Sequence, residues 1–249
     1  MAPVDLQWPG LPANVGAMST TRHGGSSVAP YDDGAGGGGL NLGTHVGDDP
    51  QAVARNRSLL RSLLPAEPAW LTQVHGTRVL DAATVSGAPE ADASIATRPG
   101  VVCAIMTADC MPVLLADAQG RVVGAAHAGW RGLAAGVLEN TVAAMRDAGA
   151  GDILAWLGPG IGPQAFEVGG DVRDAFAHLG EASGAAFAHA AQTGKFLADL
   201  PLLARLALAR AGVSQVAGGT DCTLSDARRF YSYRRDRVTG RMASLIWIK

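Results

Sequence analysis

The clearest hydrophobic pattern in the chain is a pair of apolar runs at residues 112–116 and 122–127. Residues 117–120 separate the two runs as a short segment with glycine at its end, which is typical of a hairpin loop. The preceding run, residues 101–106, is continuously apolar and therefore predicts a strand buried on both faces. Together these segments predict a sheet with a hairpin at its centre.

Three further segments have the length and pattern of strands. Residues 153–157 and 242–248 are apolar runs that we expect in the core. In residues 70–75, a period of two places Leu71, Gln73 and His75 on one face of a strand. We therefore expect Gln73 and His75 to point into the same space.

Helical spacing is clearest at residues 50–64, where Asp49 can cap a helix that begins with Pro50. The other segments predicted to be helical are residues 132–147, 168–179 and 199–211. Roughly the first forty residues, and the stretch 81–98, are expected to be irregular, with the glycine run at 34–39 as a flexible loop. This mixture predicts the α+β class, and because no repeat or linker divides the chain we expect one domain, residues 1–249.

Composition narrows the classes of protein that this chain can represent. The 249 residues are 48% apolar, which is enough for a substantial core, and carry 20 basic and 22 acidic side chains. Nucleic acid is not an expected partner, since there is no basic tract. No eighteen-residue apolar stretch or secretory signal is visible, so we expect no membrane contact and a cytoplasmic location. Three cysteines without CxxC spacing indicate reduced thiols.

Cys110 and His127 are the strongest candidates for chemistry. Both lie at the ends of the predicted hairpin away from its turn, so the hairpin can bring them together, and His75 lies on another predicted strand. One thiolate and two imidazoles suit zinc or copper and leave a fourth position open for water or substrate. The alternative is a buried thiol with two structural histidines, which is the more common situation for scattered residues of these types.

Other residues close to Cys110 and His127 in the sequence are candidates for phosphate binding and proton transfer. Residues 129–132 begin a predicted helix whose free N–H groups would favour phosphate, and Arg131 or Arg22 could add a charged contact. Asp109 is the nearest acid for a proton transfer. Asp109 could instead cap a turn, and Arg131 could be a solvated surface charge. The arginine cluster at 228–235 is expected to be a solvated strand face, with anion binding as the less common alternative.

Several motifs resemble the laccase-domain family, also called the multicopper polyphenol oxidase-like or peptidoglycan editing factor family. The blocks that carry this resemblance are residues 72–76 (TQVHG), 108–115 (ADCMPVLL), 127–132 (HAGWRG), 157–162 (LGPGIG) and 230–236 (FYSYRRD). Residues 41–50 (NLGTHVGDDP) are similar to the family pattern too. The chain departs from that pattern at the glycine run 34–39 and at Arg237, where a glycine usually follows.

The resemblance implies a layered α/β sandwich with mixed sheets, surrounding helices and zinc bound by His75, Cys110 and His127. It also implies phosphorolysis of adenosine, inosine, guanosine and methylthioadenosine, together with deamination of adenosine. Purine nucleosides and phosphate would then be the partners of a monomer or small homo-oligomer. His75, Asp109, Cys110 and His127 would be catalytic, and the expected substrate-binding residues are Arg22, Asn41, Gln73 and Arg131.

Three other functions stay open at the level of sequence. A cysteine-type hydrolase that edits peptidoglycan precursors would use Cys110 as nucleophile and His127 or His75 as base. A copper-dependent polyphenol oxidase would bind Cu²⁺, but the chain has no His-x-His pair of the multicopper kind. A structural zinc site would need a fourth protein ligand, for which Cys222 could serve.

Overall fold

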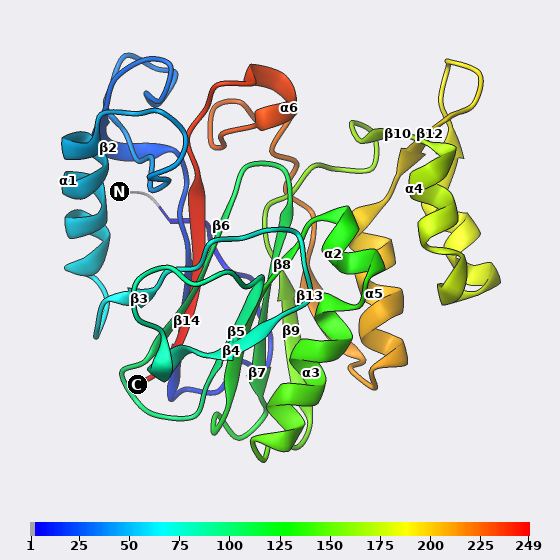
Figure 1. Ribbon diagram of the computed structural model, residues 1–249, viewed down its shortest axis with the longest axis horizontal. Helices are drawn as coiled ribbons and strands as arrows, with labels where there is room; N and C mark the ends of the chain where they lie inside the picture. The colour runs from blue at the N-terminus through cyan, green and yellow to red at the C-terminus, as the bar shows by residue number, and fades with distance from the viewer. Residues whose placement is uncertain (1–2) are drawn as a thin grey trace.

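Two large sheets packed face to face form the centre of the protein, described here for residues 3–249 from a computed structural model (Figure 1). The smaller of the two has the strand order β1 (Val15–Ser19), β14 (Met242–Ile248), β6 (Val102–Thr107) and β3 (Pro68–Ala69). The larger has the order β13 (Gln215–Gly218), β9 (Ile153–Leu157), β7 (Met111–Asp117), β8 (Val123–Ala128), β5 (Ala93–Ala96) and β4 (Val79–Asp81). Both sheets are mixed, with parallel pairs at β3–β6, β9–β13 and β4–β5.

Helices cover the outer faces of the two sheets. The side chains between the sheets, among them Ile105, Leu114 and Ile246, are buried and apolar. Helix α1 (Pro50–Arg61) lies against the four-stranded sheet, where Leu60 belongs to the same apolar cluster as Ala104 and Leu245. Helices α3 (Val137–Asp147) and α5 (Leu200–Arg210) cover the six-stranded sheet (Figure 1). The result is a sandwich of four layers, and burial of apolar surface stabilises the packing of each layer on the next.

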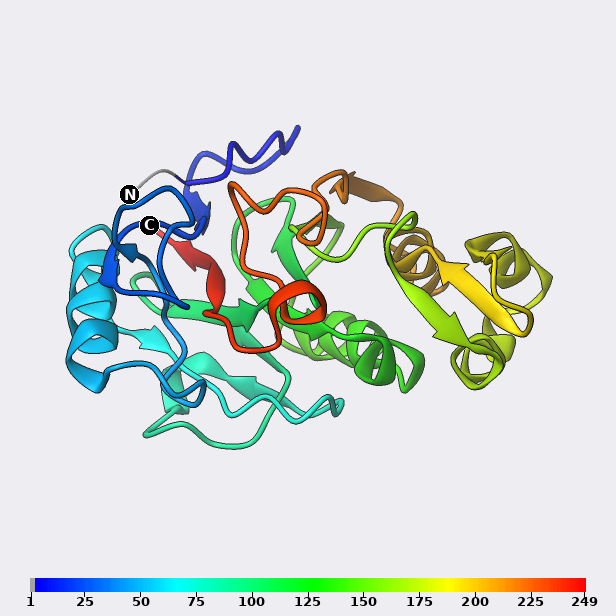
Figure 2. The same cartoon turned by 90° about the horizontal axis from the view of Figure 1, so that it is seen from above.

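A smaller unit extends from the end of the sandwich opposite α1 (Figure 2). Its elements are β10 (Glu167–Gly169), α4 (Gly170–Ala175), β11 (Phe187–His189) and β12 (Lys195–Ala198), with 3₁₀ turns at Ala177–Leu179 and Glu181–Ala186. The remaining elements are β2 (His23–Ser27), a 3₁₀ turn at Ala82–Thr84, α2 (Trp130–Ala134) and α6 (Tyr233–Asp236). Phe176, Phe187 and Phe196 join this unit to the same apolar core as α3 and α5.

The α+β class and the main core elements are as the sequence predicts. The hairpin is β7–β8, which pairs from Met111 with Ala128 to Ala116 with Val123. The predicted apolar strands are β6, β9 and β14. Helix α1 begins at Pro50 with Asp49 as its cap, and α5 is capped by Asp199, whose carboxylate accepts a hydrogen bond from the Leu202 N–H.

Some predicted elements are wrong. Residues 70–75 do not form a strand, because the backbone turns at His75, where φ is 61°. The predicted helix 132–147 is two helices, α2 and α3, since Gly136 between them has a φ of 97°. The predicted helix 168–179 contains strand β10, the short α4 and a 3₁₀ turn.

Segments predicted to be irregular also contain strands. Strands β1 and β2 lie within the first forty residues, and the stretch 81–98 contains the last residue of β4 and all of β5. The glycine run at 34–39 does lack regular structure, as expected. The arginine cluster is not a strand face, because α6 and a loop replace the strand. Within residues 3–249, no helix combines the length and the apolar character needed to cross a bilayer.

Candidate metal centre and active site

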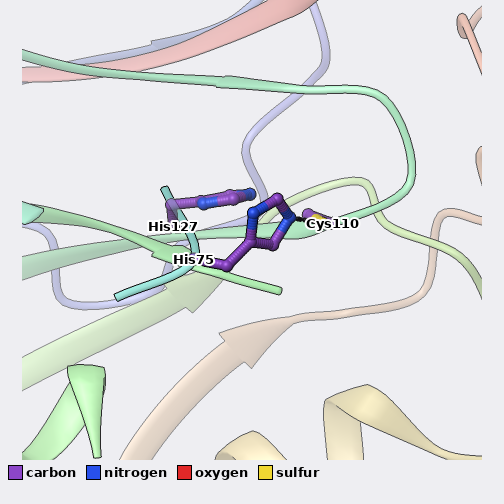
Figure 3. A group of neighbouring side chains, drawn as sticks. All are labelled: His75, Cys110 and His127. Atoms are coloured by element: carbon purple, nitrogen blue, oxygen red, sulfur yellow. Dashed lines mark hydrogen bonds between the residues drawn. The ribbon is translucent and has the colours of Figure 1, made fainter. Parts of the chain in front are cut away.

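His75, Cys110 and His127 come together at the edge of the sandwich, where the chain passes from one large sheet to the other (Figure 3). Cys110 lies in the connection between β6 and β7, His127 is on β8, and His75 is on the loop after β3. Their ligand atoms all lie within 4.8 Å of one another. The Cys110 Sγ is 3.6 Å from the His75 Nε2, and the two imidazole rings have centroids 4.8 Å apart.

The buried carboxylate of Asp92 orders two of these three residues. One of its oxygens is 2.8 Å from the His127 Nδ1, which leaves the Nε2 of His127 free to act as a ligand. The same carboxylate accepts hydrogen bonds from the backbone N–H groups of Val74, His75 and Gly76, at 3.2, 2.9 and 2.7 Å. These bonds hold His75 in its left-handed backbone conformation, which would otherwise be costly for a residue other than glycine.

Asp109 has a comparable role beside Cys110. Its φ is 96°, an unfavourable value that local contacts must maintain. The carboxylate accepts hydrogen bonds from the Thr223 hydroxyl at 2.7 Å and from the Arg234 N–H at 2.6 Å. The backbone carbonyl accepts a third, from the Ile161 N–H at 2.8 Å. Asp109 thereby fixes the turn that presents Cys110.

The charges of the site favour a thiolate. Burial raises the pKa of the Cys110 thiol, but the charge and hydrogen bond of His127, followed by the contacts with His75, lower it to about 6. Burial lowers the pKa of His127, whereas the Cys110 thiolate and the Asp92 carboxylate raise it to about 9. Without metal, the two residues therefore form a thiolate–imidazolium pair at neutral pH.

The space between the three side chains depends on Gly129. A Cβ at this position would lie 2.9 Å from the Cys110 Sγ and 2.9 Å from the His75 Cδ2. The site is open on one side, because His75 is exposed and Cys110 is half-buried while His127 is buried. Two imidazoles and one thiolate, kept apart by a glycine, fit a tetrahedral metal ion with one open position.

Comparison with known proteins places the chain in a family. A family model described as multi-copper polyphenol oxidoreductase laccase matches residues 16–249. The chain belongs to this family. It is 54% identical to "Purine nucleoside phosphorylase PA4543" of Pseudomonas aeruginosa, with 97% of this chain and 96% of the relative covered. It is also 52% identical to "Purine nucleoside phosphorylase YfiH" of Escherichia coli, with 97% of each chain covered.

A solved structure of the family has the same fold. The crystal structure of Neisseria meningitidis protein NMB0706 superposes with a TM-score of 0.91, at 50% identity and with 99% of each chain covered. The layered sandwich implied by the sequence motifs is therefore the fold of this family.

Three of the residues predicted to bind substrate use their polar groups within the protein. The Gln73 amide donates to the Met106 carbonyl and accepts from the Met106 N–H, both at 2.8 Å, so it does not share the space of His75. Asn41 is buried, and its amide bonds with Gly43, Asp48 and the Arg241 N–H. Arg22 is buried and donates to the carbonyls of Asp32 and Ala227.

The fourth, Arg131, is exposed, and its guanidinium lies 4.5 Å from the centre of the Trp130 ring. The start of α2 packs closely on the His75 loop, since a Cβ at Gly132 would lie 2.9 Å from the Gly76 carbonyl oxygen. Arg131 is therefore near the candidate centre, and phosphate contact by this residue stays a prediction.

Two arginines of the 228–235 cluster use their donors within the protein. Arg235 donates to the carbonyls of Thr223, Leu224 and Phe230, and Arg229 pairs with Asp221 and Asp226. A cavity of about 440 Å³ in this region is lined by Met111, Gly160 and Cys222, among others, and by none of the three candidate ligands. Cys222 is thus directed to that cavity and not to the candidate centre.

Sequence reasoning did not identify Asp92 as a functional residue. It lies in the stretch 81–98 that has no clear period, yet its carboxylate is fully buried and accepts four hydrogen bonds. An acidic residue next to an apolar strand, in a chain with two candidate histidine ligands, was the available signal.

Proposed function

We propose that the protein is a zinc-dependent purine nucleoside phosphorylase acting on adenosine, inosine, guanosine and methylthioadenosine, with adenosine deaminase activity at the same site. The observation that carries this proposal is the convergence of His75, Cys110 and His127, in a chain about half identical to proteins named purine nucleoside phosphorylases. The donor set suits zinc; copper, suggested by the oxidase name of the family, is the alternative ion.

In the proposed phosphorolysis, an oxygen of hydrogenphosphate forms a bond to C1′ of the ribose as the bond from C1′ to the purine breaks. The electron pair leaves with the purine, and the proton of hydrogenphosphate is transferred to it, so the products are free base and ribose 1-phosphate. A bound zinc ion would act as a Lewis acid and could lower the pKa of a water molecule for the deamination. Asp92 would keep His127 oriented, and Asp109 is the acid proposed for proton transfer in deamination.

A cysteine-type hydrolase is the second candidate, favoured by the thiolate of Cys110 beside two imidazoles. In that reaction Cys110 would attack an amide or ester carbonyl, the leaving group would take a proton from an imidazole, and water would release the acyl group. This chemistry needs no metal, so a chelator separates the two candidates.

The proposal is tested by incubating adenosine and inosine with the protein, with and without phosphate, while hypoxanthine, adenine and ammonia are measured. Phosphate-dependent release of base supports a phosphorylase, and ammonia from adenosine supports the deaminase. If no base is released in the presence of phosphate while zinc is bound, the proposal is wrong. Hydrolysis of a peptidoglycan precursor that survives chelation would then favour the second candidate.

A further inference from the structure

Three basic side chains, those of His45, Arg57 and Arg241, gather beside the candidate metal centre, and none of the ion pairs within residues 3–249 involves them. Arg57 and Arg241 are half-buried. In residues 3–249 the arginine–carboxylate pairs use other arginines: Arg22, Arg55, Arg121, Arg173, Arg229 and Arg235. Partly buried cations without ion pairs are unusual, because burial of an unpaired charge is costly.

The segment from Asn41 to His45 holds the two arginines together. Arg57, on α1, donates from its Nε to the Leu42 carbonyl at 2.9 Å. The Arg241 N–H donates to the Asn41 Oδ1 at 2.8 Å, and its side chain packs on Gly43, where a Cβ would lie 2.9 Å from the Arg241 Cγ. Two arginines that are far apart in the sequence therefore approach the same short loop, which His45 continues.

Both guanidinium groups are fixed and still have free donors. Arg57 lies 4.2 Å from the centre of the Trp70 ring, and Arg241 donates from Nη1 to the carbonyls of Thr239 and Gly240. Among residues 3–249, no hydrogen bond uses the Nη1 of Arg57 or the Nε and Nη2 of Arg241. The buried hydroxyl of Thr239 likewise has no hydrogen-bond partner among residues 3–249.

The cluster lies close to the candidate centre. Arg241 directly precedes Met242 of β14, which pairs with Thr107 at the end of β6, and Cys110 follows Thr107 by three residues. The Nη2 of Arg57 is 3.8 Å from the Sδ of Met106, the residue whose backbone pairs with Gln73 on the His75 loop. Arg57 and Arg241 thus lie at the end of β6 from which the chain continues to Cys110.

The positive charges of the two arginines also oppose protonation of His45. Partial burial lowers the pKa of His45, and the charges of Arg241 and Arg57 lower it further. Burial likewise lowers the pKa of Arg57, and the charge of Glu67 acts on it in the opposite direction. A bound oxyanion would offset this repulsion, and the planar guanidinium groups suit phosphate, which accepts paired N–H donors.

We propose that His45, Arg57 and Arg241 form the subsite that binds inorganic phosphate as the second substrate, in place of Arg131, the residue that the sequence predicts for this role. The subsite rests on the proposed phosphorolysis for its role, but phosphate binding to it can be measured without turnover. Arg57 and Arg241 would hold the phosphate oxygens, and the subsite would present the nucleophilic oxygen toward a ribose next to the metal centre.

Calorimetric titration of the zinc-loaded protein with inorganic phosphate tests the subsite. We expect Arg241→Gln and Arg57→Gln to weaken phosphate binding by about 10- to 100-fold, and Arg241→Lys to weaken it less, since it keeps the charge but not the paired donors. Arg98→Gln is the control, because Arg98 is an exposed arginine elsewhere on the protein. Unchanged zinc content in each variant shows that the fold is intact.

Kinetics with each substrate varied separately complete the test. We expect Arg241→Gln to raise the KM for phosphate with little effect on the KM for inosine, and Arg131→Ala to leave the KM for phosphate unchanged. The subsite is wrong if Arg131→Ala raises that KM and Arg241→Gln does not. It is also wrong if Arg241→Gln weakens the binding of adenosine 5′-monophosphate but leaves the binding of free phosphate unchanged. Arg241-dependent phosphate binding without any nucleoside cleavage would instead overturn the proposed function and leave the subsite standing.

Discussion

At the scale of single residues, Asp92 contributes most to the arrangement of the candidate centre although it is not a ligand. Its carboxylate connects the His127 ring to the backbone of the His75 loop. Burial opposes ionisation of Asp92, but the hydrogen bonds from His127 and Gly76 lower its pKa, so it is a carboxylate at neutral pH. An ionised partner at Nδ1 makes the Nε2 of His127 a better metal ligand.

We therefore expect Asp92→Asn to weaken zinc binding by about 10- to 100-fold, because the amide keeps the shape but loses the charge. Zinc affinity is measured by competition with a chelator of known affinity. Asp117→Asn is the matched control, since Asp117 is a buried carboxylate at the other end of β7 that pairs with Arg121. Equal zinc affinity in the two variants would mean that Asp92 does not support the centre.

The thiols of Cys103 and Cys110 have different pKa values because their surroundings differ. Burial raises the pKa of Cys103 to about 12, whereas that of Cys110 is lowered to about 6. We expect iodoacetamide at pH 7 to modify Cys110 in zinc-free protein and to spare Cys103, because the thiolate is the reactive form. The rate at Cys110 should fall as the pH drops through 6, where the thiol becomes protonated.

Peptide mapping by mass spectrometry measures each site separately. Zinc should protect Cys110 and leave the half-exposed Cys222 as reactive as before, so Cys222 is the internal control. Modification of Cys110 at the same rate with and without zinc would remove it from the set of ligands.

At the scale of elements, the sequence predicts those parts that a local pattern determines. The hairpin β7–β8, helix α1 and strand β14 follow from runs of apolar residues and from the Asp49–Pro50 start. Residues 70–75 have the period of a strand, but Asp92 draws three N–H groups of that loop into a turn. No local pattern reveals this, because the bonds join residues that are 16 to 18 positions apart.

Gly129, in the connection between β8 and α2, allows a test of whether the centre needs the space between its three side chains. Gly129 has a φ of −64°, which any residue can adopt, so Gly129→Ala changes the space and not the backbone preference. The added Cβ would press on the Cys110 Sγ and on His75, and we expect loss of bound zinc with a folded protein. Zinc content and circular dichroism measure the two properties.

Gly170→Ala is the matched control, because a Cβ at Gly170 meets no atom within 4 Å. Full zinc content in Gly129→Ala would show that the three ligands do not surround a metal ion as their positions indicate.

At the scale of the whole molecule, the candidate centre depends on the packing of the two sheets. Cys110 follows β6 of one sheet and precedes β7 of the other, while His127 belongs to β8 beside it. The sequence predicts the three candidate ligands from the hairpin and from the family motifs, and the fold brings these residues together. The basic cluster was not identified, because His45, Arg57 and Arg241 come from distant segments that meet only in the folded protein.

The central claim is that this metal centre performs a phosphate-dependent cleavage of nucleosides. It is tested most directly by adding zinc in steps to metal-free protein while the rate of hypoxanthine release from inosine and phosphate is followed. We expect the rate to rise in proportion to zinc up to about one equivalent per chain, and Cys110→Ala to give no such rise. A full rate in the metal-free protein, or a full rate without phosphate, would contradict it.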